Sequence, residues 1–429
     1  MYIPCNKFRL ISYQAIFLLY LTVILILNLD CTERSPDNPF DPGSHIHSPV
    51  NLSLEPQDKT VRLHWEIKDI KDFVGFRIYK AIGDSSKFFL LKELPAETRS
   101  YLDTTLQYYQ LYSYRVSVQG YDIESSLSNR KEYYPGPNQV MILSKYGYSL
   151  HQFSYDLKYR LAFYNTNYLP YNWDIDLLGN CIWYTIPQYH SISRINLSSK
   201  FKDTFSNPPL YQPIDIKWDM VNRRALILDQ IKKQIYIFEN QNITDSLQLD
   251  SDTYFKMHIT SHADIASICD SNAIIFIKGT NLSRTITFES GYIGKDITSC
   301  DDFIYFLVAN TRKNISLIIK LGFEEFSPQI LELSGLYNLL RVHKKDQYFW
   351  ASEVLEQNIN RCVKLSYTGQ RLLELTSQNE IEDIQINMID HSLLVVERYE
   401  DRISLFNSTG TKISENVQVY DPIRVLIIE

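Results

Sequence analysis

The sequence predicts an all-β protein in which a small sandwich domain precedes a β-propeller of seven blades, or of six if the region before Asp174 is irregular. Short alternating apolar and polar stretches, separated by turn residues, run from residue 49 to residue 137. A longer phrase of strands and turns then recurs up to residue 429, with a period of about 40 to 45 residues. Tyrosine is abundant at 31 of 429 residues and glycine is scarce at 14. This composition fits a strand-rich chain whose turns use Asn, Asp and Ser.

Composition and charge restrict the class of protein. Apolar residues make up 45% of the chain and charged residues 22%, which is enough to build full cores and excludes a mostly disordered chain. The 43 basic and 50 acidic residues give a net charge of −7. We therefore expect no nucleic-acid partner, because such proteins carry a basic patch or an overall positive charge.

Residues 1–30 have the layout of a secretory signal peptide. Lys7 and Arg9 lie in a short basic head, and the stretch from Leu10 to Leu29 carries no charge. The chain becomes polar directly after Cys31. This pattern predicts export of the remaining chain.

Cys31 at this junction resembles the lipid-modified first residue of mature bacterial lipoproteins, although Asn28 and Asp30 depart from the residues usual before such a cysteine. The resemblance implies a diacylglycerol on the Cys31 thiol and a lipid anchor in the bacterial cell envelope, at the outer membrane or the cell surface. Two alternatives stay open. Twenty uncharged residues can span a bilayer as an uncleaved transmembrane anchor, and simple secretion is the other.

Residues 31–48 are rich in residues that break regular structure. The run from Asn38 to Pro42, Asn-Pro-Phe-Asp-Pro, resembles the short tether that follows the lipidated cysteine in some bacterial surface lipoproteins. We interpret it as a solvated linker, with calcium binding by Asp37, Asn38 and Asp41 as the alternative.

The sequence from residue 49 to 137 reads as an antiparallel sandwich. Trp65 ends an alternating strand, and the stretch from Gly75 to Tyr79 reads Gly-Phe-Arg-Ile-Tyr. Leu106 lies six residues before Tyr112, and Asp103 precedes this pair. Together these residues resemble a fibronectin type III domain. The resemblance implies a buried Trp65, a "tyrosine corner" at Tyr112, and a rigid spacer more than a specific binding module.

Residues 138–429 repeat one phrase: an acidic residue followed by isoleucine, an alternation, a dense apolar run and a final alternation. The clearest copies start at Asp215 and Asp383, and weaker copies start at Asp174, Asp264, Asp296 and near Leu339. All-strand repeats of this period are typical of propeller blades with four strands each.

The two ends of this region complement each other. Residues 422–429 read as a first strand with no blade after it, and residues 139–143 read as a second strand with no first strand before it. We expect the two to pair, which closes the ring and removes open sheet edges. The Pro-x-Asp-Ile phrase at Pro213 resembles NHL-type and YVTN-type propellers, and the missing Trp-Asp dipeptides disfavour the WD-repeat type. The resemblance implies a fold and no particular function.

Candidate site residues are few. The acidic residues at the copy starts (Asp174, Asp215, Asp264, Asp296 and Asp383) are expected to bond backbone between blades, and the alternative is a ring that binds a cation in the channel. His258 and His262 lack a third zinc ligand. Tyr171, Trp173 and Tyr211, with Tyr168 and Tyr189, are candidates for stacking on a sugar or anchoring a protein, with plain packing as the alternative.

The four cysteines of the repeat region, Cys181, Cys269, Cys300 and Cys362, show no metal-ligand spacing. We expect buried thiols, with a Cys269–Cys300 disulfide as the alternative. No catalytic residue, metal site or cofactor is predicted.

These observations predict a membrane-anchored, extracytoplasmic binding or scaffold protein whose propeller face binds a protein or a glycan. One alternative is a propeller enzyme, a lyase or hydrolase of an extracytoplasmic glycan, which requires titratable groups to converge at one mouth of the channel. The other alternative is a purely structural component of the envelope.

Overall fold

The computed structural model describes residues 50–428, except 58, 68–72, 84, 137–138, 207–209, 251–252, 278–282, 301–302, 323–326, 344–345, 357–358 and 377–378. The described chain is almost entirely β, with two single-turn 3₁₀ helices at Pro187–Tyr189 and Arg398–Glu400. The predicted signal peptide, Cys31 and the tether lie outside the described residues. Within the described part of the chain, no helix is long and apolar enough to cross a membrane.

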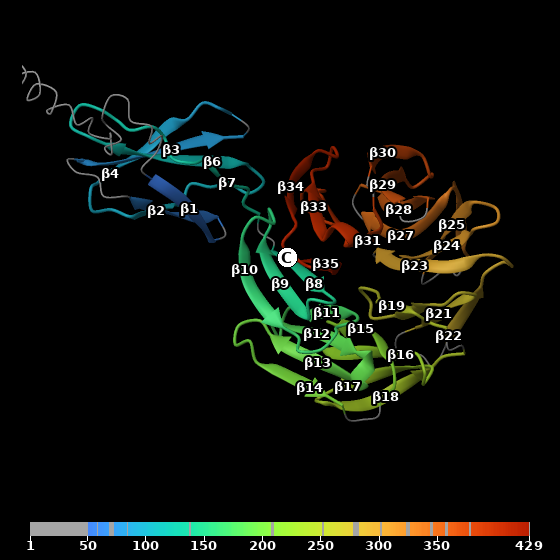
Figure 1. Ribbon diagram of the computed structural model, residues 1–429. Coiled ribbons are helices and arrows are strands. Elements are labelled where there is room, and N and C mark those ends of the chain that lie inside the picture. The colour runs from blue at the N-terminus through green and yellow to red at the C-terminus, as the bar shows by residue number, and fades with distance from the viewer. Residues whose placement is uncertain are drawn as a thin grey trace, which may run out of the picture. The chain divides into compact units, whose positions relative to one another are not determined.

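The chain divides into two compact units. The first comprises the residues up to Glu55, Val61–Asp103 and Leu111–Glu132, and the second comprises Pro56–Thr60, Thr104–Gln110 and Tyr133–Glu429. Each unit is built from antiparallel sheets (Figure 1).

The first seven strands form two sheets, one in the order β1-β2-β5 and the other in the order β4-β3-β6-β7. Their bounds are β1 Val50–Gln57, β2 Thr60–Ile67, β3 Gly75–Ile82, β4 Phe89–Pro95, β5 Ser100–Asp103, β6 Tyr112–Gln119 and β7 Lys131–Tyr133. Alternate residues of β2 are buried, as the period of two predicts.

The core of the first unit combines aromatic packing with one buried ion pair. The rings of Trp65 and Phe76 lie 5.4 Å apart between centroids, and Tyr112 is buried. The ammonium of Lys80 lies 2.7 Å from Oδ2 of Asp103, and Tyr114 donates its hydroxyl proton to the same oxygen at 2.8 Å. A buried carboxylate with two such partners is satisfied, which removes most of the cost of burying its charge.

The second unit contains seven four-stranded antiparallel sheets among its described residues. The first strands are β11 Trp173–Asp176, β15 Pro213–Asp219, β19 Lys256–Ile259, β23 Ile293–Cys300, β27 Leu336–His343, β31 Ile381–Ile386 and β35 Pro422–Ile428. The second strands are β12 Cys181–Ile186, β16 Arg224–Asp229, β20 Ile265–Ile268, β24 Phe303–Asn310, β28 Tyr348–Glu356, β32 Leu393–Glu397 and β8 Gln139–Ser144.

The outer strands complete each sheet. The third strands are β13 Ser191–Asn196, β17 Gln234–Glu239, β21 Asn272–Phe276, β25 Ile315–Gly322, β29 Ile359–Ser366, β33 Arg402–Phe406 and β9 Ser149–Ser154. The fourth strands are β14 Lys202–Phe205, β18 Asn242–Gln248, β22 Ser283–Thr287, β26 Gln329–Ser334, β30 Arg371–Thr376, β34 Lys412–Asn416 and β10 Arg160–Asn165. The first strands lie on the inner side of the ring of sheets (Figure 1).

Seven hydrophobic clusters hold these sheets together, and each cluster joins two neighbouring sheets. One cluster contains Phe306 of β24 together with Ile275 of β21, and another contains Leu394 of β32 together with Ile142 of β8. The second strands are therefore buried on both faces, which explains their dense apolar runs. Because one cluster joins the sheet that contains β32 to the sheet that contains β8, the series of sheets closes on itself.

The predicted pairing of the two ends is confirmed. Strand β35 runs antiparallel to β8, with Val425 opposite Ile142 and Ile427 opposite Val140. The sheet order is β10-β9-β8-β35, so the first strand of this sheet comes from the far end of the chain.

One predicted copy was placed one strand too late. Asp264 directly precedes β20, which is a second strand, and the first strand of that sheet is β19 at Lys256–Ile259. The acid–isoleucine pair at Asp264-Ile265 was therefore wrongly interpreted as the start of a first strand. The same two residue types stand there at the start of a buried second strand. In the corrected register, Lys256 stands where neighbouring sheets have Asp215 and Asp296.

Candidate functional site

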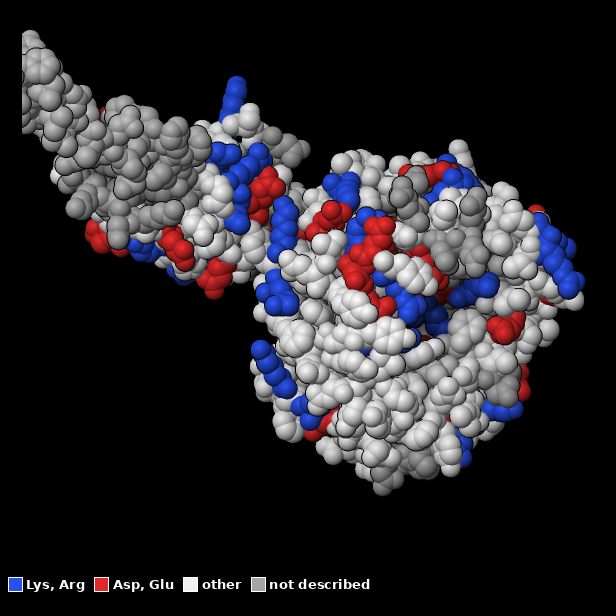
Figure 2. Space-filling model, in the orientation of Figure 1, with Lys and Arg blue, Asp and Glu red and all other residues white. Residues whose placement is uncertain are grey.

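The first strands surround a cavity of about 350 Å³ in the second unit. Its lining includes polar and charged side chains from all seven of these strands and from the segment before β11: Asn172, Asp174, Lys217, Lys256, His258, Ser299, Arg341, Asp383, Gln385 and Arg424. Lys and Arg side chains are visible in the hollow of this unit (Figure 2). The volume lies in the range of small-molecule sites, which is about 300–1,000 Å³.

Aspartates on four of the seven first strands bond the backbone of the next first strand. Oδ2 of Asp215 accepts the backbone N–H of Met257 at 2.7 Å, and Oδ2 of Asp383 accepts that of Val425 at 3.1 Å. Oδ2 of Asp174 accepts the N–H of Trp218 at 2.7 Å. The expected role in bonding backbone between neighbouring sheets is confirmed for these residues. Asp264 does not share it, because its backbone and side chain bond locally to Thr260.

Asp296 is the most heavily used of these carboxylates. Oδ2 accepts the N–H of Leu340 at 2.9 Å and an Arg341 N–H at 2.8 Å, and Oδ1 pairs with the Lys256 ammonium. Burial alone would raise the pKa of Asp296, but the charges of Lys256 and Arg341 outweigh burial and hold this pKa well below its ordinary value. Asp296 is therefore ionised at neutral pH.

Two of the cationic side chains are fixed by carboxylates. Arg341 bridges Asp296 and Asp383, with an N–H to Oδ1 of Asp383 at 2.6 Å. Burial lowers the pKa of Lys256 to about 8, even though the neighbouring Asp296 acts in the opposite direction. Lys256 thus changes its charge close to neutral pH.

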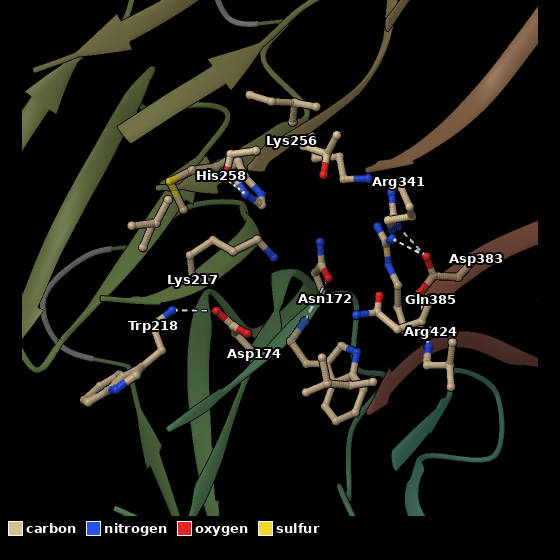
Figure 3. Close-up of a pocket in the computed structure, with 18 of the residues that line it drawn as sticks. Asn172, Asp174, Lys217, Trp218, Lys256, His258, Arg341, Asp383, Gln385 and Arg424 are labelled. Carbon is tan, nitrogen blue, oxygen red and sulfur yellow. Dashed lines mark hydrogen bonds and ion pairs between the residues drawn. The ribbon is translucent and has the colours of Figure 1, made fainter. Parts of the chain in front are cut away.

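The other two cations keep donors available for a ligand. The ammonium of Lys217 lies 3.4 Å from Asp215, and the Arg424 guanidinium lies 3.6 Å from Asp383. Neither side chain donates a hydrogen bond to any other described residue, although Lys has three N–H donors and Arg has five. In Figure 3 the labelled side chains of Lys217, Arg341 and Lys256 converge on one space.

Neutral polar groups complete the lining. His258 shares a hydrogen bond of 2.8 Å with the Ser299 hydroxyl. Burial, together with the positive charges of Lys217, Lys256 and Arg341, lowers the pKa of His258 to about 3, so its imidazole is neutral. Burial raises the pKa of Asp174 above its ordinary value, against the opposite effect of the neighbouring Lys217. Because the carboxylate oxygens already accept backbone N–H groups while cationic donors face the cavity, the arrangement is suited to binding an anion.

The three aromatic residues predicted to bind a ligand, Tyr171, Trp173 and Tyr211, differ in burial and in whether they line the cavity. Trp173 is 6% exposed, packs in the core between two sheets and touches the cavity lining. Tyr171 and Tyr211 are 46% and 44% exposed, and the ammonium groups of Lys145 and Lys232 lie 5.6 and 3.9 Å from their ring centroids. Only Trp173 of the three belongs to the cavity.

The cysteine prediction is confirmed for the described residues, where Cys181, Cys269, Cys300 and Cys362 are buried thiols without a disulfide. The cationic residues of the cavity were missed from the sequence. A signal existed, because in the correct register Lys256 and Arg424 occupy the position that three other first strands give to Asp215, Asp296 and Asp383. Because the copy start was placed at Asp264, Lys256 was not recognised as the residue at this position of its first strand.

No protein-family model matches the sequence, and no curated protein matches it either. Among solved structures, a candidate 6-phosphogluconolactonase from Bacteroides uniformis is 11% identical, covering 68% of this chain and 99% of its own, with a TM-score of 0.53. A functionally unknown protein from Desulfotomaculum acetoxidans is 13% identical over the same shares, with a TM-score of 0.53. The dihydro-heme d1 dehydrogenase NirN is 8% identical, covering 67% of this chain and 75% of its own, with a TM-score of 0.51. At such identities the likeness concerns the fold alone. The chain shares an all-β, propeller-like fold with these proteins.

Proposed function

We propose that the second unit is a binding domain that takes an acidic saccharide, or a closely related hydroxylated carboxylate, into the axial cavity. The observation that carries the proposal is the convergence of Lys217, Lys256, Arg341 and Arg424 on one cavity. Arg and Lys are the donors of choice for carboxylate groups.

The neutral part of the lining supports a ligand with hydroxyl groups. Asn172, Ser299 and Gln385 lie beside the cationic groups and offer both donors and acceptors. A ligand that combines one anionic group with several hydroxyls would use both kinds of partner.

The proposal is tested by calorimetry with the full-length chain in detergent, using oligogalacturonate as the acidic probe and a neutral oligosaccharide of equal length for comparison. Lys217→Gln and Arg424→Gln should each weaken binding of the acidic probe about tenfold, which corresponds to about 1.4 kcal/mol. These two positions are chosen because their ion pairs are the longest in the cavity, at 3.4 and 3.6 Å.

Lys232→Gln is the matched control, because it removes a lysine that lies against Tyr211 and outside the cavity. This variant should bind like the parent. Equal binding of acidic and neutral probes, or unchanged binding in both cavity variants, would contradict the proposal.

A second candidate is a lyase that acts on the same class of ligand. It is favoured by Lys256, whose pKa is lowered by burial to about 8, beside Arg341 in one cavity. An amine that can lose its proton near neutral pH can act as a base, while the guanidinium stabilises charge on the substrate carboxylate. Appearance of an unsaturated product absorbing in the ultraviolet, abolished in Lys256→Met, would support this candidate over binding alone.

We further infer three features of the chain. The second unit is a seven-bladed propeller, and the first unit is a fibronectin type III spacer. The whole chain is a bacterial envelope lipoprotein. Seven mutually packed four-stranded sheets support the blade number. Two sheets in the orders β1-β2-β5 and β4-β3-β6-β7, with Trp65 and Tyr112 buried, support the spacer. Mass spectrometry of the mature N-terminus tests the anchor, because an unmodified peptide that starts before Cys31 would exclude it.

A further inference from the structure

The turns that follow β27 and β31 bring three side chains together that no part of the proposed binding cavity uses. His343 is the last residue of β27, Asp346 lies in the turn to β28, and His391 lies in the turn from β31 to β32. One ligand atom from each lies within 4.8 Å of the others. We propose that His343, Asp346 and His391 form a site for a divalent transition metal such as Zn²⁺, with three protein ligands and one open position.

The distances match a metal-centred arrangement. Oδ2 of Asp346 lies 2.8 Å from Nδ1 of His391 and 3.7 Å from Nδ1 of His343. Ligand atoms around a tetrahedral Zn²⁺ with bonds of 2.0–2.1 Å are about 3.3 Å apart. The two observed distances lie on either side of this value, so small side-chain rotations would complete the site.

The short contact between Asp346 and His391 is not an ordinary hydrogen bond. Nδ1 of His391 is buried and forms no hydrogen bond of acceptable angle with any described residue, although Oδ2 lies only 2.8 Å away. When two ligand atoms bind the same metal ion, they lie close together but each points at the ion and not at the other ligand atom. Nδ1 of His391 and Oδ2 of Asp346 have this arrangement. The site therefore differs from a plain His–Asp ion pair.

The His343 ring is held firmly and presents a lone pair. The ring stacks on Tyr348 at 4.7 Å between centroids with planes 6° apart, and the residue is 1% exposed. Nδ1 accepts a long hydrogen bond of 3.3 Å from the Asp346 backbone N–H, which places the proton of the neutral ring on Nε2. A metal ion bound at Nδ1 would replace this long hydrogen bond as the partner of the lone pair.

The donor set identifies the class of metal. Two imidazoles and one carboxylate suit Zn²⁺ and its transition-metal neighbours, whereas Ca²⁺ and Mg²⁺ prefer oxygen ligands throughout. Asp346 is partly exposed, which gives a metal ion access from solvent. Three protein ligands leave a position for water or for a ligand, unlike a closed structural site.

The test is a Zn²⁺ titration by calorimetry of the full-length chain, after treatment with a chelator, compared with Asp346→Asn and His391→Ala. The parent should bind one equivalent of Zn²⁺ more than either variant, or bind it at least about 100-fold more tightly. Mutation of residues that only hydrogen-bond to metal ligands already lowers metal affinity about 10- to 100-fold, so loss of a ligand should lower it at least as much. Both substituted positions are partly exposed, so the variants are expected to fold, and circular dichroism checks this. With Co²⁺ as the probe, the parent should give the intense visible bands of a four- or five-coordinate complex.

His64→Ala is the matched control, because His64 pairs with Glu55 at 3.1 Å in the first unit and belongs to no three-ligand cluster. It should retain the full Zn²⁺ stoichiometry. Equal stoichiometry and affinity in the parent and in both folded site variants would overturn the proposal. So would a parent that binds Co²⁺ only with the weak bands of an octahedral aqua complex.

Discussion

Oδ2 of Asp296 in β23 accepts the backbone N–H of Leu340 in β27 at 2.9 Å, so one buried carboxylate fastens the first strand of one sheet to that of the next. Oδ1 of the same residue pairs with Lys256 of β19, the first strand on the other side. Asp296 therefore links three neighbouring sheets at the wall of the cavity. The structural role of this residue and the cationic character of the cavity depend on the same atoms.

Substitution of Asp296 by asparagine should destabilise the second unit. The change keeps the shape of the side chain but removes the carboxylate that pairs with the buried Lys256, while Arg341 keeps its pair with Asp383. Breaking a buried ion pair in this way typically costs about 3–5 kcal/mol. The measurement is the urea midpoint of the transition of the second unit. Asp203→Asn is the control, because its pair with Arg194 is partly exposed and is worth about 1 kcal/mol or less. Equal urea midpoints for the two variants would show that Asp296 does not contribute more to the stability of the second unit than an exposed ion pair.

Acid should destabilise the protein partly through His258. Its folded-state pKa is lowered to about 3, while a histidine in an unfolded chain has a pKa of about 6.5. Between these values the unfolded chain binds more protons than the folded chain, so stability falls as the pH is lowered through this window. His258→Gln should flatten the dependence of the unfolding midpoint between pH 6.5 and pH 4. His64→Gln, at an exposed position of the first unit, provides the comparison, and identical slopes for both variants would contradict the assignment.

Binding of an acidic ligand in the cavity should weaken as the pH rises from 7 to 9. Lys256, whose pKa is about 8, loses its positive charge over this interval, while Arg341 stays protonated. Lys256→Arg should bind the acidic probe with little change over the same interval, because arginine does not titrate there. Calorimetry at several pH values measures both, and a parent affinity that does not depend on pH would argue against Lys256 as a ligand contact.

Removal of residues 422–429 should open the ring. Strand β8 would become an exposed edge, and the Asp383 oxygen that accepts the Val425 N–H would lose its partner. We expect aggregation in size-exclusion chromatography and faster cleavage by protease. Removal of Glu429 alone should leave both properties unchanged. A truncated chain that stays monomeric and resistant would mean that β35 is dispensable.

Lys80→Met should destabilise the first unit alone. The substitution removes the ammonium that pairs with the buried Asp103, and breaking a buried ion pair typically costs about 3–5 kcal/mol. Calorimetric scanning should show one transition shifted down and the other in place. A shift of both transitions, or of neither, would contradict an independent core built around this pair.

Local patterns in the sequence were sufficient for much of the fold. The alternation in residues 112–118 predicts β6, and the dense apolar run in residues 393–396 predicts a strand buried on both faces, because side-chain period and burial are properties of neighbouring residues. The pairing of residues 422–428 with 139–144 also followed, since a first strand without a sheet and a sheet without a first strand complement each other.

The sites depended on the tertiary structure. Lys217, Lys256, Arg341 and Arg424 lie on four different first strands, with successive members 39, 85 and 83 residues apart, and His343 and His391 come from two different turns. Only the closed ring brings such side chains to one cavity or one cluster, and a β-bulge before Asp296, Asp383 and Arg424 decides where these three residues lie on their strands. The sequence by itself therefore determined the strands and their repetition, while the closure of the ring determined the charges of the cavity and the meeting of the two histidines with Asp346.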